Sequence, residues 1–245
     1  GGRGSAIANG DIHIDVAFLG ASSCDPMGNS CGFSRSENAK SICGSLGYAL
    51  PDARYADNVV ILTDDLVSYP NTPTSISEHD VDWVVVVDSK IASGAIRDTK
   101  NPRDILLAKE ACKVIVNSGY FKEGFSIQTG SGGASLAVVK YLRQTMIDQN
   151  VKASFALGGI TAHMVKLHEE GLIDHLIDVQ SFDKVAAESI KVDPKHKEVS
   201  ANEYASADEP GAATKFLDIV ILSALEVDVN FNVNVLVGSD GIIRG

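Results

Sequence analysis

Apolar runs rich in β-branched residues alternate with segments of helical periodicity along most of this chain. The continuous runs are typical of buried strands, and they lie at residues 15–20, 58–63, 83–88, 216–222 and 232–237. Between residues 103 and 190, apolar positions at helical spacing predict four helices, separated by the strand-like segments GFSIQTG, KASFALGG and DHLIDVQ. This alternation is typical of right-handed βαβ units, so we expect an α/β fold with mainly parallel sheets. The polar stretches 70–80 and 193–213 are predicted to be loops.

One segment of the chain repeats at a fixed offset. DVAFLGASSCDPMGN at residues 15–29 aligns without a gap with DIVILSALEVDVNFN at residues 218–232. GSLG at 44–47 resembles GSDG at 238–241 if the first copy carries an insertion around CGFSRSENAK. We therefore predict two tandem related units, although a strand followed by small residues, an Asp and a turn is common enough to recur by chance.

The two copies lie near opposite ends of the chain, which affects the predicted domains. We assign residues 1–100 to the C-terminal part of a first unit and residues 101–245 to a second unit that is truncated at its C-terminal end. Both units are thus expected to be incomplete, and we expect the natural protein to extend in both directions.

The amino-acid composition limits the classes of molecule that this protein is expected to bind. A formal net charge of −11, with 21 scattered Lys and Arg residues, disfavours nucleic acid and membrane surfaces. No apolar run reaches the roughly 18 residues that a membrane span needs, and the chain starts without the pattern of a secretory signal. We expect a cytoplasmic protein. The four cysteines form no C-x-x-C pair and the histidines show no metal-binding spacing, so we expect reduced, buried thiols and no metal.

Small residues follow two neighbouring predicted strands, and we call them the two crests: Gly130, Ser131, Gly132 and Gly133 form one, and Gly158, Gly159, Ile160 and Thr161 form the other. Each crest opens a predicted helix, whose free N–H groups favour an anion. In a parallel sheet both crests lie along the carboxyl edge, where open α/β proteins bind ligands. Three interpretations remain: a cradle for phosphate, pantetheine or carboxylate, a purely structural tight turn, and a dinucleotide site, which the Ser135 at its third glycine position disfavours.

Polar residues also gather in the second copy of the repeat. Glu226 and Asp228 flank its crest of small residues, and they could act as a general acid and base or simply cap a loop. Arg244 is a candidate clamp for a carboxylate, although most such arginines lie on the surface.

Several long stretches together resemble the alpha subunit of citrate lyase. They include IDVAFLGASSCDPMGN, VIVNSGYFKEGFSIQTGSGGASLAV, FALGGITAHMVKLHEEGLI and LSALEVDVNFNVNVLVGSDGIIRG, and with shorter matches they cover most of the chain. The resemblance implies two coenzyme A-transferase-like units. It also implies a citrate CoA-transferase activity within citrate (pro-3S)-lyase, in which an acetyl thioester on an acyl carrier protein or on coenzyme A exchanges acetate for citrate. Implied partners are citrate, the acyl carrier (gamma) subunit, the citryl-lyase (beta) subunit and further copies of the chain.

The resemblance also suggests a mechanism. Many coenzyme A-transferases use a glutamate nucleophile at the end of the strand that here reads SFALGG, where the alignment places Gly158. Lacking that carboxylate, the chain is expected to let a citrate carboxylate attack the acetyl thioester directly within a ternary complex, through a mixed anhydride. Such a mechanism needs positioning and amide donors from the protein.

Site residues follow from this mechanism. We assign Gly158, Gly159, Thr161 and Glu226 to catalysis, Arg244 to citrate, and to the carrier thioester Gly130, Ser131, Gly132, Gly133, Asn232 and Gly238. Two alternatives remain: a coenzyme A-transferase or thioester hydrolase for another short acid, and a non-catalytic module that binds sugar phosphates.

Overall fold

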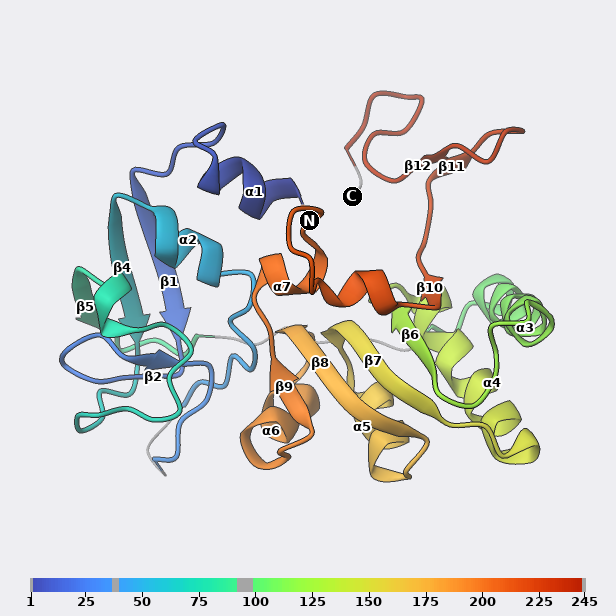
Figure 1. The fold of residues 1–245 in the computed structure, drawn as a ribbon, viewed down its shortest axis with the longest axis horizontal. Coiled ribbons are helices and arrows are strands. Elements are labelled where there is room, and N and C mark those ends of the chain that lie inside the picture. The colour runs from blue at the N-terminus through green and yellow to red at the C-terminus, as the bar shows by residue number, and fades with distance from the viewer. Residues whose placement is uncertain (1, 37–39, 92–98, 244–245) are drawn as a thin grey trace.

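The computed structural model describes residues 2–36, 40–91 and 99–243, and its longer strands form two parallel sheets (Figure 1). The first sheet has the order β1–β4–β5 and consists of β1 (Val16–Ala21), β4 (Asn58–Thr63) and β5 (Trp83–Val86). The second has the order β10–β6–β7–β8–β9 and consists of β6 (Phe125–Thr129), β7 (Ala153–Ile160), β8 (Ile173–Ser181), β9 (His196–Glu198) and β10 (Ile219–Ile221). The predicted α/β fold with mainly parallel sheets is confirmed, while the division at residue 100 stays a prediction.

Four amphipathic helices lie in a row along the five-stranded sheet: α3 (Pro102–Asn117), α4 (Gly133–Gln149), α5 (Ala162–Glu169) and α6 (Lys184–Val192). Local signals set their ends. Asn101 caps α3 by accepting the N–H of Arg103, and Asp183 caps α6 by accepting the N–H of Ala186. Their apolar faces and the strands share one core that includes Leu142, Met146 and Leu176, and each such fully buried side chain contributes about 1.5–3 kcal/mol.

A smaller core supports the three-stranded sheet. Val59 and Ile61 of the central strand β4 share this core with Ala53 of the short helix α2 (Leu50–Tyr55), and α1 (Gly2–Ala8) packs against α2. A 3-10 turn, η1 (Glu78–Asp80), precedes the edge strand β5. In Figure 1 the strands of this sheet run toward the bottom of the view and those of the five-stranded sheet toward the top.

The sequence repeat is also a repeat of structure. After β1, the chain forms a short antiparallel hairpin of β2 (Ser23–Cys24) and β3 (Ser30–Cys31). After β10, it forms an equivalent hairpin of β11 (Glu226–Val227) and β12 (Val233–Asn234). The offset of the aligned segments matches β2 with β11, and carried on by two residues past the alignment it matches β3 with β12, so the repeat extends from sequence to local structure.

Several boundaries differ from the sequence predictions, including the strand predicted at 216–222, which is shortened to β10. The stretch 193–213, predicted to be a loop, holds β9, the helix α7 (Ala201–Ala205) and the start of η2 (Ala213–Phe216). Its polar composition hid them, but Ser200 and Glu203 form a capping box whose S-x-x-E spacing could have indicated α7. The loop predicted at 70–80 likewise ends in η1. The strand predicted at 232–237 is reduced to β12, and the chain turns directly after it, where the N–H of Leu236 donates to Oδ1 of Asn234 at 3.2 Å.

Candidate functional site

The two glycine-rich crests lie beside each other at the carboxyl edge of the five-stranded sheet. β6 ends at Thr129 and α4 begins at Gly133, while β7 ends at Ile160 and α5 begins at Ala162. Since β6 and β7 are neighbours in the parallel sheet, the structure brings together the two crests that the sequence singled out. Their catalytic and binding roles stay predictions.

The first crest presents accessible backbone. Ser131 and Gly132 are exposed, and Gly132 is the N-cap of α4 with extended backbone angles. The first N–H groups of a helix have no acceptor within it, so this crest can offer amide donors to an anion. Gly130 is tied to the sheet, because its N–H donates to the carbonyl of Ile221 at 2.8 Å.

The second crest is filled by neighbouring side chains. Gly158 has φ +103°, and a Cβ built there would lie 3.1 Å from the amide carbon of Gln128. A Cβ at Gly159 would lie 1.9 Å from Cε2 of Phe182, so any side chain there would clash with the phenylalanine ring. Thr161 is fully buried, and its Oγ1 has no hydrogen-bond partner within the part of the chain that the structure describes. Close packing therefore accounts for both glycines of this crest.

A polar and aromatic cluster packs onto the second crest. Gln128, which fills the space over Gly158, donates through Nε2 to the hydroxyl of Tyr204 at 2.6 Å. Tyr204 in turn meets Tyr48 edge-on, with ring centroids 6.4 Å apart. Burial, and then the neighbouring Tyr204, raise the pKa of Tyr48, which keeps this phenol protonated at neutral pH. These three residues were not predicted as site residues, because they come from three distant segments of the chain.

The GSLG turn of the first copy binds the tips of β8 and β9. The N–H of Ser45 donates to Oγ of Ser181 at 3.0 Å, and its hydroxyl donates to the carbonyl of Asp178 at 2.8 Å. The N–H of Leu46 donates to a carboxylate oxygen of Glu198 at 2.5 Å. Gly44 has φ +76°, and a Cβ there would lie 2.1 Å from Oγ of Ser181. This turn joins the two sheets at the same edge that carries the crests.

Beneath the turn lies a buried network of ionisable groups. Asp178 and His196 have side chains with no exposed surface, and Nε2 of His196 lies 3.1 Å from Oδ2 of Asp178. Ser181 donates to the same carboxylate oxygen at 2.6 Å. Burial, and secondarily Asp178, raise the pKa of the nearby Glu198 against the lowering effect of its hydrogen bonds. Asp178, which lies between the apolar residues Ile177 and Val179 of β8, is a signal that could have revealed this network.

The polar residues of the second copy hold their own hairpin together. Glu226 accepts the N–H of Ser239 at 2.7 Å and the amide of Asn234 at 3.0 Å, and hydrogen bonding by Ser239 and Asn234 lowers its pKa. The lowered pKa keeps this carboxylate ionised at neutral pH, the state of a loop cap or of a general base, so the catalytic role of Glu226 stays a prediction. Figure 1 shows the hairpin standing off from the sheet on the extended segment after β10.

Two of the other predicted site residues in this region, Asn232 and Gly238, form hydrogen bonds with nearby residues. Asn232 donates through Nδ2 to Asp228 at 2.7 Å. The buried Gly238 donates its N–H to the carbonyl of Ile242 at 3.0 Å. Arg244, the predicted citrate clamp, lies outside the described residues.

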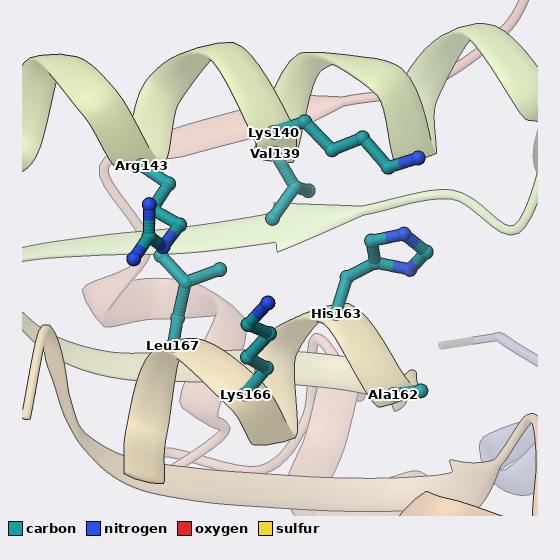
Figure 2. A pocket seen from close by; sticks show the side chains of 7 residues that line it. All are labelled: Val139, Lys140, Arg143, Ala162, His163, Lys166 and Leu167. Atoms are coloured by element: carbon teal, nitrogen blue, oxygen red, sulfur yellow. The ribbon is translucent and has the colours of Figure 1, made fainter. Parts of the chain in front are cut away.

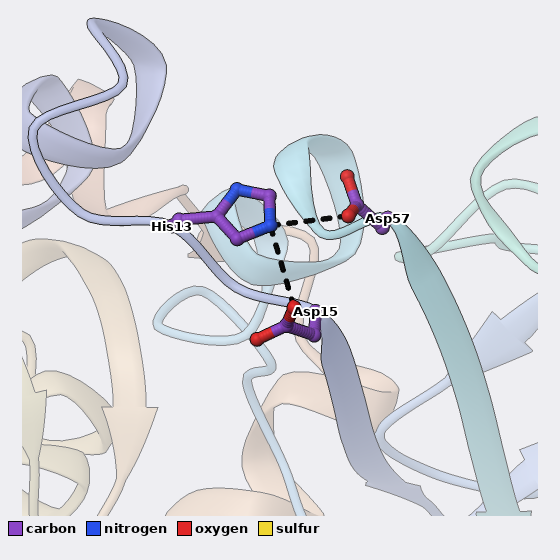
Figure 3. Close-up of side chains that lie close together, drawn as sticks. All are labelled: His13, Asp15 and Asp57. Carbon is purple, nitrogen blue, oxygen red and sulfur yellow. Dashed lines mark ion pairs between the residues drawn. The ribbon is translucent and has the colours of Figure 1, made fainter.

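The cysteines and one cluster of possible metal ligands are the other candidate reactive groups. All four cysteines are free thiols; Cys24, Cys31 and Cys112 are buried, as the sequence predicted, whereas Cys43 is half-buried. Burial raises the pKa of each thiol. Figure 3 shows His13 between Asp15 and Asp57, with ion-pair distances of 3.5 and 3.1 Å. All three side chains are exposed, which is a common arrangement of surface charges without a metal. None of the helices in the described residues is long and apolar enough to span a bilayer.

Comparison with known proteins identifies the family. The family model described as "Citrate lyase, alpha subunit (CitF)" matches residues 1–245. This chain belongs to the citrate lyase alpha subunit family. The citrate lyase alpha chains of Haemophilus influenzae and Escherichia coli are 57% and 55% identical to it over the whole chain, which covers 49% and 48% of those proteins. The chain thus spans about half the length of the curated relatives it matches.

Solved structures agree with membership of the citrate lyase alpha family. The putative alpha subunit of citrate lyase from Streptococcus mutans, in complex with citrate, superimposes with a TM-score of 0.91 at 58% identity, over all of this chain and 48% of that one. A 4-hydroxybutyrate CoA-transferase from Porphyromonas gingivalis gives a TM-score of 0.60 at 16% identity, over 92% of this chain and 54% of that one. At such low identity the second match shows the fold alone, and that fold is the coenzyme A-transferase-like one that the sequence predicted.

Proposed function

We propose that this chain serves the citrate lyase alpha subunit in transferring a carrier thioester from acetyl to citrate. The observation that carries the proposal is the match along the entire chain to the Streptococcus mutans protein, at 58% identity and a TM-score of 0.91, in a structure that holds citrate. A second support is the pair of adjacent crests at the carboxyl edge of the five-stranded sheet. This edge is where open α/β proteins bind ligands.

The proposed chemistry uses a substrate carboxylate as the nucleophile. β7 ends in Gly158, Gly159 and Ile160, so this strand tip offers no carboxylate of its own. A citrate carboxylate oxygen attacks the acetyl carbonyl, and the carbon–sulfur bond breaks to give a mixed anhydride and a thiolate. The thiolate then attacks the citryl carbonyl, and acetate leaves. The protein's part is to position both substrates and to stabilise each oxyanion with N–H donors.

The first crest is the better candidate for those donors. Ser131 and Gly132 are exposed at the start of α4, and the amides of this crest would hold the acetyl carbonyl or the carrier. The second crest, packed under Gln128 and Phe182, would shape the floor of the site. Contacts of Asn232 and Gly238 with the carrier, of Glu226 with the reacting groups and of Arg244 with citrate complete the proposal.

The same proposal includes the partners of the reaction. The donor is an acetyl thioester on the phosphopantetheine-type arm of an acyl carrier (gamma) subunit, for which acetyl-coenzyme A can substitute. The product, a citryl thioester, passes to a citryl-lyase (beta) subunit, and copies of the alpha chain associate with each other.

The test is a direct assay of citryl thioester formation. Acetyl-coenzyme A and citrate are incubated with this chain, and also with a chimera in which it replaces the matching half of the Streptococcus mutans protein. We expect citryl-coenzyme A and acetate in equal amounts, and no acylated glutamate on the protein by mass spectrometry. An inactive chimera beside an active parent would refute the proposal. Citrate-independent release of acetate would instead indicate a thioester hydrolase, and transfer to another acid a different CoA-transferase.

A further inference from the structure

The side chain of Gln128 lies at the edge of the sheet that carries both crests. Gln128 is the penultimate residue of β6, two positions before Gly130 of the first crest. A Cβ built on Gly158 of the second crest would lie 3.1 Å from Cδ and 3.2 Å from Nε2 of Gln128. The carboxamide therefore fills the space that a side chain at position 158 would enter.

The two faces of the five-stranded sheet offer different surroundings to a ligand near the crests. On the face covered by helices, a groove between α4 and α5 begins at Ala162, directly after the second crest (Figure 2). Ile127 of β6 packs into the core with these helices, so the next side chain, that of Gln128, points to the opposite face. A substrate that contacts Gln128 therefore lies on the side of α7, outside this groove.

The carboxamide of Gln128 is held in one orientation and keeps a free donor. Its Nε2 donates one hydrogen to the hydroxyl of Tyr204 at 2.6 Å, and this bond limits rotation of the amide. A primary amide carries two N–H hydrogens, and within the part of the chain that the structure describes the carboxamide forms no other hydrogen bond. Gln128 is half-buried, so its side chain retains exposed surface where the second N–H can meet a ligand.

Tyr204 is itself fixed by the GSLG turn that joins the two sheets. In α7, the N–H of Ala201 donates to the carbonyl of Gly47 at 2.9 Å, and the ring of Tyr204 meets Tyr48 edge-on. Both contacts attach α7 to the turn and to the residue that follows it. The turn thus holds in place the hydroxyl that orients the Gln128 amide, which makes Tyr204 a positioning residue.

We infer that Gln128 is a catalytic residue of the acyl transfer, and that its second Nε2–H donates to the oxyanion of the reacting thioester. This inference rests on the proposed function and adds a side-chain donor to it. When a citrate carboxylate bonds to the acetyl carbon, the carbonyl electron pair moves onto oxygen, and the N–H stabilises that charge while keeping its proton. The pair returns as the carbon–sulfur bond breaks and the thiolate leaves. A donor that is oriented beforehand needs no reorganisation during this step.

Kinetics of citryl-coenzyme A formation by the chimera with the Streptococcus mutans protein test the inference. Gln128→Met keeps a side chain of similar length over Gly158 but has no N–H donor. We expect its kcat to fall on the order of 10²–10³-fold, as when one oxyanion donor is removed, while the KM values and Tm stay nearly unchanged. Gln144→Met is the matched control: Gln144 is exposed on α4 and donates to Asp148 at 2.7 Å, so its replacement should leave kcat unchanged.

Tyr204→Phe tests the positioning role of the tyrosine hydroxyl. Without this acceptor the amide of Gln128 can rotate, and kcat should fall on the order of tenfold because one orienting hydrogen bond is lost. In the Gln128→Met background the same substitution should have no further effect on kcat, since the group that Tyr204 orients is gone. Equal losses in both backgrounds would show that Tyr204 does not act through Gln128.

The outcomes separate this inference from the proposed function. A parent chimera that forms no citryl-coenzyme A would overturn both. An active parent beside an equally active Gln128→Met chimera would overturn the role of Gln128 alone, because packing over Gly158 would then be its whole contribution. If Gln128→Met is unstable, Gln128→Glu gives the second test: it keeps the shape of the side chain but places a negative oxygen where the donor was. Its kcat should fall at least as far, and an unchanged kcat would again exclude a donor at this position.

Discussion

Asn232 donates through Nδ2 to Oδ2 of Asp228 at 2.7 Å, and Asn29 makes the same bond to Asp25 at 2.9 Å. In both copies the aspartate Oδ1 also accepts the backbone N–H of that asparagine, at 2.9 and 3.2 Å. The aspartate N–H returns a bond to the asparagine carbonyl, at 3.1 Å in each copy. The Asp and Asn residues that repeat in the sequence are thus the ones that form this turn. This shared role explains why they recur although the surrounding residues differ.

The two turns differ in their surroundings, and this predicts different responses to acid. Asp25 is fully buried. Burial raises its pKa, but hydrogen bonds from the N–H of Asn71 and from Asn29 and Met27 outweigh it, so its pKa lies below the usual value. A carboxyl whose folded pKa is lowered stabilises the fold above its unfolded pKa of about 3.9 and loses that contribution as pH falls through the folded value.

We therefore expect acid to weaken the wild-type fold more than it weakens Asp25→Asn. Urea unfolding at several pH values between about 5 and 2 would measure this, because the variant lacks one proton-linked contribution. Asp228→Asn is the comparison: hydrogen bonds from Asn232 also lower the pKa of Asp228, but this carboxyl is exposed, so solvent screening should make its effect on acid sensitivity smaller than that of Asp25. Equal acid sensitivity in wild type and Asp25→Asn would contradict the assignment.

The raised pKa of Glu198 predicts that the stability of the fold changes with pH in the opposite direction to that expected from Asp25. Its pKa is raised, chiefly by burial, so the folded state holds a proton that the unfolded state has already released above about pH 4.3. Stability should then fall as pH rises from the unfolded pKa through the folded one. Glu198→Gln should remove this decline and keep an acceptor for the N–H of Leu46. Thermal unfolding of both proteins between pH 4 and pH 8 would measure this decline. If the Tm of Glu198→Gln falls with pH as much as that of the wild type, Glu198 is not its cause.

The sequence predicts those features of the fold and the site that depend on local patterns of residues, and it misses those that depend on contacts between distant positions. Strand β4 was predicted at the observed residues 58–63, because a continuous apolar run has few other stable placements. The crest residues were placed at the correct edge, since parallel strands align their ends. By contrast, the bond between Gln128 and Tyr204 joins positions 76 residues apart. Neither periodicity nor spacing encodes such a contact, and the same holds for the binding of the GSLG turn to β8 and β9.

Gly159 should be intolerant of any side chain. A Cβ there would lie 1.9 Å from the ring of Phe182, so Gly159→Ala is expected to destabilise the fold by about 1–3 kcal/mol through overpacking. Adding Phe182→Ala should relieve the clash, and a double-mutant cycle would give a coupling energy of the same order. Gly211→Ala, with no atom within 4 Å of its Cβ position, is the control. Additive effects of the two substitutions would show that the clash is not the cause.

Gly132→Val tests the role of the first crest in acyl transfer. A valine there keeps allowed backbone angles, since Gly132 has φ −69° and ψ 149°. Its Cβ would lie 3.1 Å from the hydroxyl of the exposed Ser223, which can move aside. The variant should therefore fold, at a cost of about 1 kcal/mol for a poorer N-cap. The branched side chain would nevertheless cover the amides at the start of α4, so we expect the citrate-dependent formation of citryl-coenzyme A to be lost.

The matched control is Gly211→Val, which adds the same side chain where the structure has open space. Both variants are compared in the chimera with the Streptococcus mutans protein, by thermal unfolding and by the kcat and KM for citrate and for acetyl-coenzyme A. A loss of kcat in Gly132→Val at a nearly unchanged Tm supports amide donors at this crest, because removing an oxyanion donor acts on the transition state. If Gly132→Val transfers as fast as Gly211→Val, then the amides of this crest do not contact the reacting thioester, and the donors must lie elsewhere on the strand edge.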